Sequence, residues 1–320
     1  MMRRRDLLRT LAGGVAVARL AHAARITRGN VCFVTDEVSR DLSTALKFAS
    51  EFGVRQVEIR NVDDKYCFRH DPSKLKEIHA QLKEHGIRVA VLDTPVLKCT
   101  LPGLPLTPES DRASQGLQRD LPIPRDQQFG IQMDLLHQAI EAARLLETDM
   151  LRIFAYWRVQ DLQQAQPRIV EGLSRAAEVA AKEKIRLCLE NENACNVATS
   201  AEAAAILAQV KSPALGLNWD FVNAVNAGEA AYPDGFNKLD KKRIWHVHVK
   251  DVRIDPATKR HQVCAVGDGM VPHHEIFTSL AKAGYKGALS METHFSLNGQ
   301  REPASRRSMQ GILKVIDGLW

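Results

Sequence analysis

Carboxylate and imidazole side chains recur near the ends of short apolar runs along this chain. Glu58, Glu190, Asp220 and Glu292 each lie near the end of such a run, and the run Trp245–Lys250 carries two histidines. Carboxylates crowded together away from water repel one another and lose solvation, so they need a cation. Two or three carboxylates with one imidazole form an ordinary divalent site, where Mn²⁺, Mg²⁺ or Co²⁺ fits best and Zn²⁺ also fits. A divalent metal is therefore the expected cofactor.

These residues need a fold that brings the ends of the runs together. From about Ala24 onward a short β-rich run is followed by a helical stretch, eight times over. The strands are expected at Val31–Thr35, Gln56–Asn61, Arg88–Asp93, Met150–Tyr156, Ile185–Glu190, Ala214–Asp220, Ile244–Lys250 and Ala288–Glu292. The helices are expected at Asp41–Phe52, Pro72–His85, Gln127–Glu147, Pro167–Lys184, Ser200–Val210, Phe236–Lys242, His273–Ala283 and Ser305–Leu319.

Eight strand–helix units favour parallel pairing through right-handed crossovers, and hence an α/β fold made of a single (β/α)8 TIM barrel. An open dinucleotide-binding sheet is the alternative, but it needs a glycine-rich turn after its first strand. Here the first strand leads into Thr35-Asp36-Glu37-Val38, with no glycine.

The alternation of side chains along a strand decides which residues face the barrel interior. His246, His248 and Lys250 share one face, and the apolar residues between them share the other. The polar face is expected to point inward, near the C-terminal strand ends where barrels build active sites. The two long connections after strands three and seven, residues 95–126 and 251–272, lie on that side and are expected to be substrate lids.

The first 23 residues are typical of a targeting segment rather than of a folded domain. Arg4-Arg5-Asp6-Leu7-Leu8 precedes a short apolar stretch, and Ala21-His22-Ala23 supplies the small residues of a cleavage site. We expect residues 1–23 to be a twin-arginine signal peptide and residues 24–320 to be the barrel, working in the periplasm or otherwise exported. An arginine-rich transit peptide is the alternative.

Without these residues the formal charge falls from +6 to +2, so the remaining chain lacks the surplus of basic residues that is typical of nucleic-acid-binding proteins. No second apolar run reaches membrane length, so no stable membrane anchor is expected. The six cysteines show no CxxC or Cys/His spacing, which makes a zinc cluster unlikely. Whether Cys67 and Cys99, both in expected loops, form a disulfide is left open.

Six motifs give residues 24–320 a resemblance to the xylose isomerase-like TIM barrels, the sugar phosphate isomerase/epimerase family. They are Gly53-Val54-x-x-Val57-Glu58, Leu189-Glu190-Asn191, Asn218-Trp219-Asp220, His246-Val247-His248-Val249-Lys250-Asp251, Gly267-Asp268-Gly269 and the stretch from Gly284-Tyr285-Lys286-Gly287 to Glu292. The family includes ketose 3-epimerases, hydroxypyruvate isomerase, inosose dehydratase and apurinic endonucleases. Carried over by position, the resemblance implies four metal ligands, Glu190, Asp220, His248 and Glu292.

The resemblance also implies an activity, namely a metal-dependent sugar isomerase or epimerase. Glu190 and Glu292 would be the catalytic residues, removing a proton beside a carbonyl and returning it through a metal-stabilised enediolate. Two alternatives stay open. One is a lyase or dehydratase acting on keto-sugars, inososes or 3-keto-glycosides by the same enediolate, and the other is a non-catalytic exported sugar-binding protein.

The expected partner is a small carbohydrate or polyol, and a homo-oligomer is left open. The predicted substrate-binding residues are His246, Lys250, Asn223, Glu58, Arg253 and Trp157. Asn223 stands where ketose epimerases carry a histidine, and a neutral amide binds a hydroxyl but cannot shuttle protons. Glu58 has a second interpretation, as the ion-pair partner of Arg60.

Overall fold

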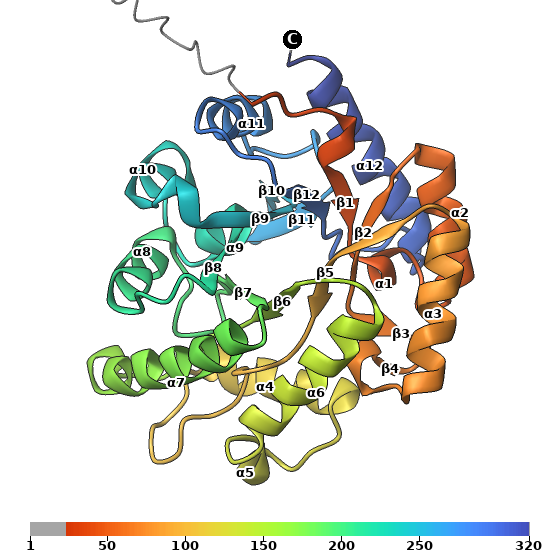
Figure 1. Ribbon diagram of the computed structural model, residues 1–320. Coiled ribbons are helices and arrows are strands. Elements are labelled where there is room, and N and C mark those ends of the chain that lie inside the picture. Colours follow the sequence, from red (N-terminus) through yellow and green to blue (C-terminus); the bar gives the residue numbers. More distant parts are fainter. Residues whose placement is uncertain (1–23, 320) are drawn as a thin grey trace, which may run out of the picture.

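A ring of eight parallel strands forms the centre of the molecule (Figure 1), which is a computed structural model describing residues 24–319. The predicted signal peptide, residues 1–23, lies outside the described residues. The strands are β1 (Val31–Phe33), β2 (Gln56–Ile59), β5 (Arg88–Asp93), β6 (Met150–Ile153), β7 (Arg186–Glu190), β8 (Leu215–Asp220), β9 (Ile244–Val249) and β12 (Ala288–Met291).

The strands follow the order β1-β12-β9-β8-β7-β6-β5-β2 around the ring, so each pairs with its neighbour along the chain. A parallel bridge between Val34 and Glu58 joins the two ends of this order. The predicted (β/α)8 barrel is confirmed. All eight expected runs form strands because their apolar residues are buried on both faces, against the barrel interior and against the surrounding helices.

The helices surround the strands (Figure 1). The helices that follow barrel strands are α2 (Leu42–Phe52), α3 (Pro72–Glu84), α6 (Gln132–Leu145), α7 (Leu162–Lys182), α8 (Ser200–Gln209), α10 (Phe236–Lys238), α11 (His273–Lys282) and α12 (Arg301–Asp317). The other helical elements are α1 (Thr35–Val38), α4 (Pro108–Asp120), α5 (Arg125–Gln128), α9 (Phe221–Asn226), and the turns η1 (Arg28–Asn30), η2 (Cys67–Arg69), η3 (Ala231–Gly235) and η4 (Lys241–Arg243).

Helix boundaries follow the capping residues. Asp71 accepts hydrogen bonds from the backbone N–H groups of Ser73 and Lys74, and Pro72 opens α3 as predicted. The start of α7 was predicted too late. Asp161 caps that helix, which begins at Leu162 and carries Pro167 in its second turn rather than its first.

The two long connections are structured. The first contains α4 and α5, and the second contains a hairpin of β10 (Asp251–Ile254) and β11 (His261–Cys264), while β3 (Asn61–Val62) and β4 (Lys65–Tyr66) form another hairpin after β2. Asp251 anchors the chain after β11. Its Oδ2 accepts hydrogen bonds from the N–H groups of Gly267 (2.9 Å) and Gly269 (3.0 Å). A Cβ at residue 269 would lie 2.1 Å from Asp251 Oδ1, so glycine is needed there.

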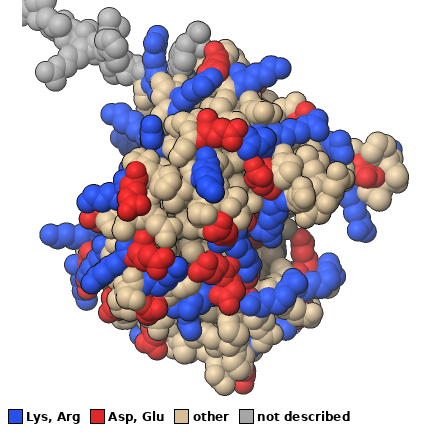
Figure 2. Space-filling model, turned by 90° about the vertical axis from the view of Figure 1, so that its right-hand side faces the viewer, with Lys and Arg blue, Asp and Glu red and all other residues tan. Residues whose placement is uncertain are grey.

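The surface carries acidic and basic side chains side by side (Figure 2). Among residues 24–319 no helix is long and apolar enough to cross a membrane. All six cysteines are buried free thiols, Cys67 and Cys99 included. Burial raises the pKa of the Cys67 thiol to about 12.

Candidate metal centre

Four side chains from four neighbouring strands meet at the C-terminal mouth of the barrel. Glu190 ends β7, Asp220 ends β8, His248 lies on β9 and Glu292 directly follows β12. One ligand atom from each lies within 4.8 Å of the others, and all four residues are buried. These are the four residues predicted as ligands. Parallel strands end at the same edge of a barrel, which is why residues 102 positions apart in sequence come together.

The donor atoms of this group fit a divalent cation. Glu190 Oε2, Asp220 Oδ2, His248 Nδ1 and Glu292 Oε2 are buried and form no hydrogen bond. Buried polar atoms that form no hydrogen bond are costly, and a cation bound between these four atoms would remove that cost. Three carboxylates and one imidazole are ligands that Mn²⁺, Co²⁺ and Zn²⁺ accept.

Glu58 orients the imidazole of His248 from below. The Nε2–H of His248 donates to Glu58 Oε1 at 3.0 Å, so Nδ1 is left to face the three other ligands. His246 Nε2 (2.8 Å) and Ser290 Oγ (2.6 Å) donate to the other oxygen of Glu58. Burial raises the pKa of Glu58, but the charges of His248 and His246 outweigh burial and lower the pKa well below its usual range.

Lys250 supplies a positive charge at the same place. Its Nζ lies 2.7 Å from Asp220 Oδ2 and 2.7 Å from Glu292 Oε2, although neither contact has the direction of a hydrogen bond. Burial lowers the pKa of Lys250, but the charges of Asp220 and Glu292 raise it above its ordinary value. The ammonium group thus supplies positive charge at the point where these carboxylates converge.

Glu190 is held from two sides. Arg152 Nη1 lies 3.2 Å from Glu190 Oε2 and 2.9 Å from Asp93 Oδ2, and Asn223 Nδ2 donates to Glu190 Oε1 at 3.2 Å. Burial raises the pKa of Glu190, but the charges of Arg152 and His248 lower it to about 2. Burial raises the pKa of Asp93 well above its ordinary value. Glu190 is therefore ionised, as a ligand carboxylate must be.

Glu292 is held at the rim of the barrel. Its Oε1 lies 2.9 Å from Arg60 Nη1 and 3.0 Å from His294 Nε2. Arg60 also pairs with Asp36 (3.1 Å) and Glu37 (2.5 Å). The side chain of His294 is 40% exposed, and it borders a cavity of about 400 Å³ that Arg60 and Glu37 also line. The cavity therefore lies beside two of the side chains that contact Glu292.

Three of the six predicted substrate-binding residues lie away from the mouth, and their contact with substrate stays a prediction. Glu58 is fully buried beneath His248 and does not pair with Arg60, so the ion-pair interpretation is wrong. Arg253 lies exposed on β10 and donates to Gln262 Oε1 across the hairpin at 3.1 Å. His246 is buried two residues before His248 on β9, and its Nε2 binds Glu58.

The other three predicted contacts lie near the mouth. Lys250 contacts two of the candidate metal ligands, as described above. The side-chain amide of Asn223 donates to Glu190 Oε1 and to the carbonyl of Asn191 (3.1 Å). Asn223 therefore positions Glu190. Trp157 is 2% exposed and lines, with Lys98 and Glu192, a second opening of about 170 Å³. Its contact with substrate stays a prediction.

Sequence reasoning missed Arg152, Asp93, Asp36, Glu37 and His294. Arg152 interrupts the apolar run Met150–Ile153, and Asp93 ends the apolar strand β5. A charged residue in an apolar strand is unusual, and the alternation of side chains along the strand could have indicated which face it occupies. Asp36 and Glu37 follow β1 in the short helix α1, which was not predicted.

A family model described as the xylose isomerase-like TIM barrel matches residues 46–315. The chain belongs to this family. Inosose dehydratase from Geobacillus thermodenitrificans (strain NG80-2) is 26% identical over 162 residues, which cover 46% of this chain and 51% of that protein. The chain thus spans about half the length of the curated relatives it matches.

Two solved structures show the same fold. The IOLI protein with a binding zinc atom gives a TM-score of 0.69 at 16% identity, covering 91% of this chain and 99% of that chain. The probable 3-DHS dehydratase AsbF from Bacillus anthracis gives 0.68 at 16% identity, covering 88% and 98%. At such identities the likeness concerns the fold alone.

Proposed function

We propose that this protein is a divalent-metal-dependent dehydratase. It removes the proton beside the carbonyl of a neutral keto-polyol and expels the β-hydroxyl group, which takes up that proton and leaves as water, so that a C=C bond forms. The carrying observation is the group of four buried ligand atoms at the barrel mouth that form no hydrogen bond. Glu190, Asp220, His248 and Glu292 would hold the metal. When bound, such an ion polarises a carbonyl group and acidifies the neighbouring C–H bond.

Glu190 and Glu292 are the proposed proton-transfer groups. They lie on either side of Asp220 and His248 in the strand order, so they flank a ligand bound at the mouth. Asn223 and Arg152 fix Glu190, while Arg60 and His294 fix Glu292. His294, partly exposed beside Glu292, is placed to hydrogen-bond a substrate hydroxyl.

The charge of the mouth favours an uncharged substrate. Eight carboxyl groups and five Lys or Arg side chains line it or support it: Asp36, Glu37, Glu58, Asp93, Glu190, Glu192, Asp220 and Glu292 against Arg60, Lys98, Arg152, Lys250 and Arg301. With Asp93 protonated, one divalent ion balances the remaining negative charge. The mouth then has no surplus positive charge for a carboxylate or phosphate, which favours an uncharged keto-inositol or keto-sugar.

Two observations favour the dehydratase branch over the isomerase or epimerase branch that the sequence placed first. Asn223 is committed to Glu190 and offers no second proton shuttle. The curated relatives matched over about half their length are named inosose dehydratases. An isomerase or epimerase would use the same two glutamates, and a non-catalytic sugar-binding protein would need neither as a base.

The test is proton chemistry in D₂O. The metal-loaded chain is incubated with an inosose and followed by ¹H NMR, with and without chelator, beside Glu190→Gln, Glu292→Gln and the exposed control Glu178→Gln. We expect metal-dependent loss of the α-proton signal and an unsaturated product, slowed roughly 10²–10⁴-fold in the two site variants only. An epimerised product would favour the isomerase branch. Binding without exchange, or equal rates in all variants, would refute an enzymatic role for the pair.

Export by residues 1–23 remains part of the proposal. Its test is fractionation of cells that express the full chain, beside the variant in which Arg4 and Arg5 are both changed to Lys. Export of the parent and retention of the variant in the cytoplasm are expected. Equal distribution of the two proteins would refute a twin-arginine signal.

A further inference from the structure

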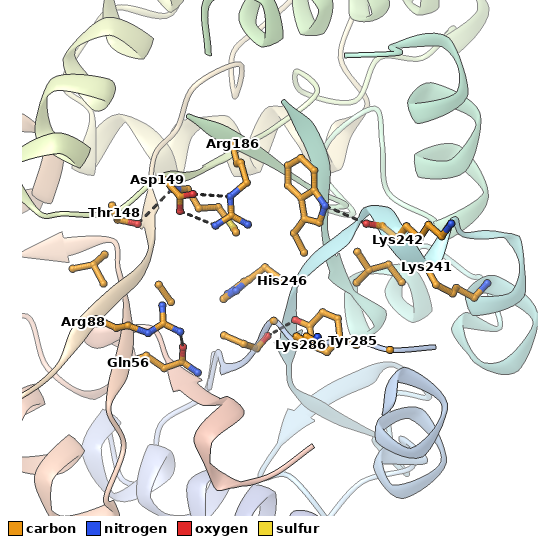
Figure 3. Close-up of a pocket in the computed structure, with 18 of the residues that line it drawn as sticks. Gln56, Arg88, Thr148, Asp149, Arg186, Lys241, Lys242, His246, Tyr285 and Lys286 are labelled. Atoms are coloured by element: carbon orange, nitrogen blue, oxygen red, sulfur yellow. Dashed lines mark hydrogen bonds and ion pairs between the residues drawn. The ribbon is translucent and has the colours of Figure 1, made fainter. Parts of the chain in front are cut away.

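A cavity of about 540 Å³ lies at the opposite end of the barrel from the metal centre. It is lined by the first residues of several barrel strands, among them Gln56 of β2, Arg88 of β5 and Arg186 of β7 (Figure 3). Its volume is within the range of small-molecule sites. The proposed reaction makes no use of this end of the barrel, so the cavity needs its own explanation.

The wall of this lower cavity is built by a close contact between two strands. Trp245 lies over Gly216, where a Cβ would come within 2.2 Å of the indole ring. Trp245 Nε1 donates to the carbonyl of Lys242, and the guanidinium of Arg186 lies 5.9 Å from the ring centre. A glycine on a barrel strand thus makes room for the aromatic wall.

Positive charge surrounds the lower cavity and is only partly neutralised. Five Lys or Arg residues line it against two acids: Arg88, Arg186, Lys241, Lys242 and Lys286 against Glu147 and Asp149. Asp149 forms an ion pair with Arg186, whose Nε donates to Oδ2 at 2.9 Å and whose Nη2 donates to Oδ1 at 2.7 Å. Arg88 donates to the neutral amide of Gln56 and, within residues 24–319, pairs with no carboxylate. An anion is the partner that Arg88 lacks.

A buried imidazole faces the same space. His246 is 1% exposed, lines the cavity and lies at its centre in Figure 3, between Arg88 and Lys242. Its Nε2 lies 2.8 Å from Glu58, so Nδ1 is the ring nitrogen left for a ligand. A hydroxyl group both donates and accepts, so it can pair with Nδ1 whichever ring nitrogen carries the proton.

We infer that the lower cavity is a second binding site, for a small polyol that carries a phosphate group. The phosphate would lie against Arg88, with Lys286 at the rim, and a hydroxyl of the same molecule would form a hydrogen bond with His246 Nδ1. The Lys and Arg residues of this site do not touch the metal ligands, although His246 is connected to His248 through Glu58. Its lining carries a surplus of basic side chains.

The test is isothermal titration of the full metal-loaded chain with glycerol 3-phosphate, methyl phosphate and glycerol. Glycerol 3-phosphate is expected to bind most tightly, methyl phosphate several-fold more weakly because it leaves Nδ1 unpaired, and glycerol not measurably. Arg88→Gln should weaken glycerol 3-phosphate binding roughly tenfold or more, as for loss of a charge-assisted hydrogen bond. The control Arg175→Gln removes an exposed arginine from α7 and should bind like the parent.

Metal content and thermal unfolding of each variant are measured in parallel, and Lys286→Gln replaces Arg88→Gln if the latter fails to fold. Unchanged metal content with weakened phosphate binding supports the second site and separates it from the metal centre. Three results would overturn the inference: no binding of glycerol 3-phosphate at millimolar concentration, equal binding by parent and cavity variants, or equal affinity for glycerol and its phosphate.

Discussion

Replacing Glu58 by glutamine should weaken metal binding although Glu58 does not touch the metal. The Glu58 carboxylate accepts from His248 Nε2 (3.0 Å), His246 Nε2 (2.8 Å) and Ser290 Oγ (2.6 Å), so both of its oxygens are used as acceptors. In the variant one oxygen becomes an NH₂ group that faces donors. His248 then loses the partner that keeps its proton on Nε2 and leaves Nδ1 free for the metal.

Loss of such a supporting carboxylate typically weakens metal affinity about 10–100-fold, or about 1.4–2.7 kcal/mol. We expect this loss for Glu58→Gln, measured by competition with a fluorescent chelator. Glu178→Gln, which removes the same charge from an exposed helix position, is the matched control and should match the parent. An affinity for Glu58→Gln within twofold of the parent, in a protein that unfolds cooperatively, would refute the role assigned to Glu58.

Three further predictions concern the centre and the barrel. Asn223→Ala removes the N–H that holds Glu190 and should lower kcat about 5–10-fold with little change in KM, measured by proton exchange. Chelator should lower the Tm of the parent by roughly 5 °C, since metal at about 100 times Kd adds about 2.7 kcal/mol, whereas Glu292→Gln should barely respond. Gly216→Ala should cost about 1–3 kcal/mol in urea unfolding because its Cβ meets Trp245, while Gly116→Ala, whose nearest neighbour is 3.8 Å away, should cost nothing.

The sequence was sufficient to predict the barrel and the arrangement of its four candidate ligands. Each barrel strand is a short apolar run between helical stretches, and in a parallel barrel every strand ends at the same rim. Polar residues at the ends of consecutive strands, such as Glu190 and Asp220, must then be neighbours. No side-chain detail is needed for that step, since topology alone supplies it.

The supporting contacts could not be predicted in the same way, because they depend on how deep each residue lies in the barrel and how far its side chain extends. Glu58 and Arg60 have the same strand parity, yet Glu58 lies level with His248 while Arg60 extends at the rim to Glu292. A long guanidinium side chain can reach several carboxylates, and spacing does not choose among them. In the loop after β5, six prolines obscured a start signal, Thr107-Pro108, that caps α4.

The measurement that tests the central claim most directly is anomalous diffraction from crystals of the chain loaded with Mn²⁺ or Zn²⁺. We predict one strong peak at the barrel mouth, about 2.0–2.3 Å from Glu190, Asp220, Glu292 and Nδ1 of His248. Absence of a peak at saturating metal, or a peak coordinated by other residues, would contradict the assignment of these four side chains as a metal centre.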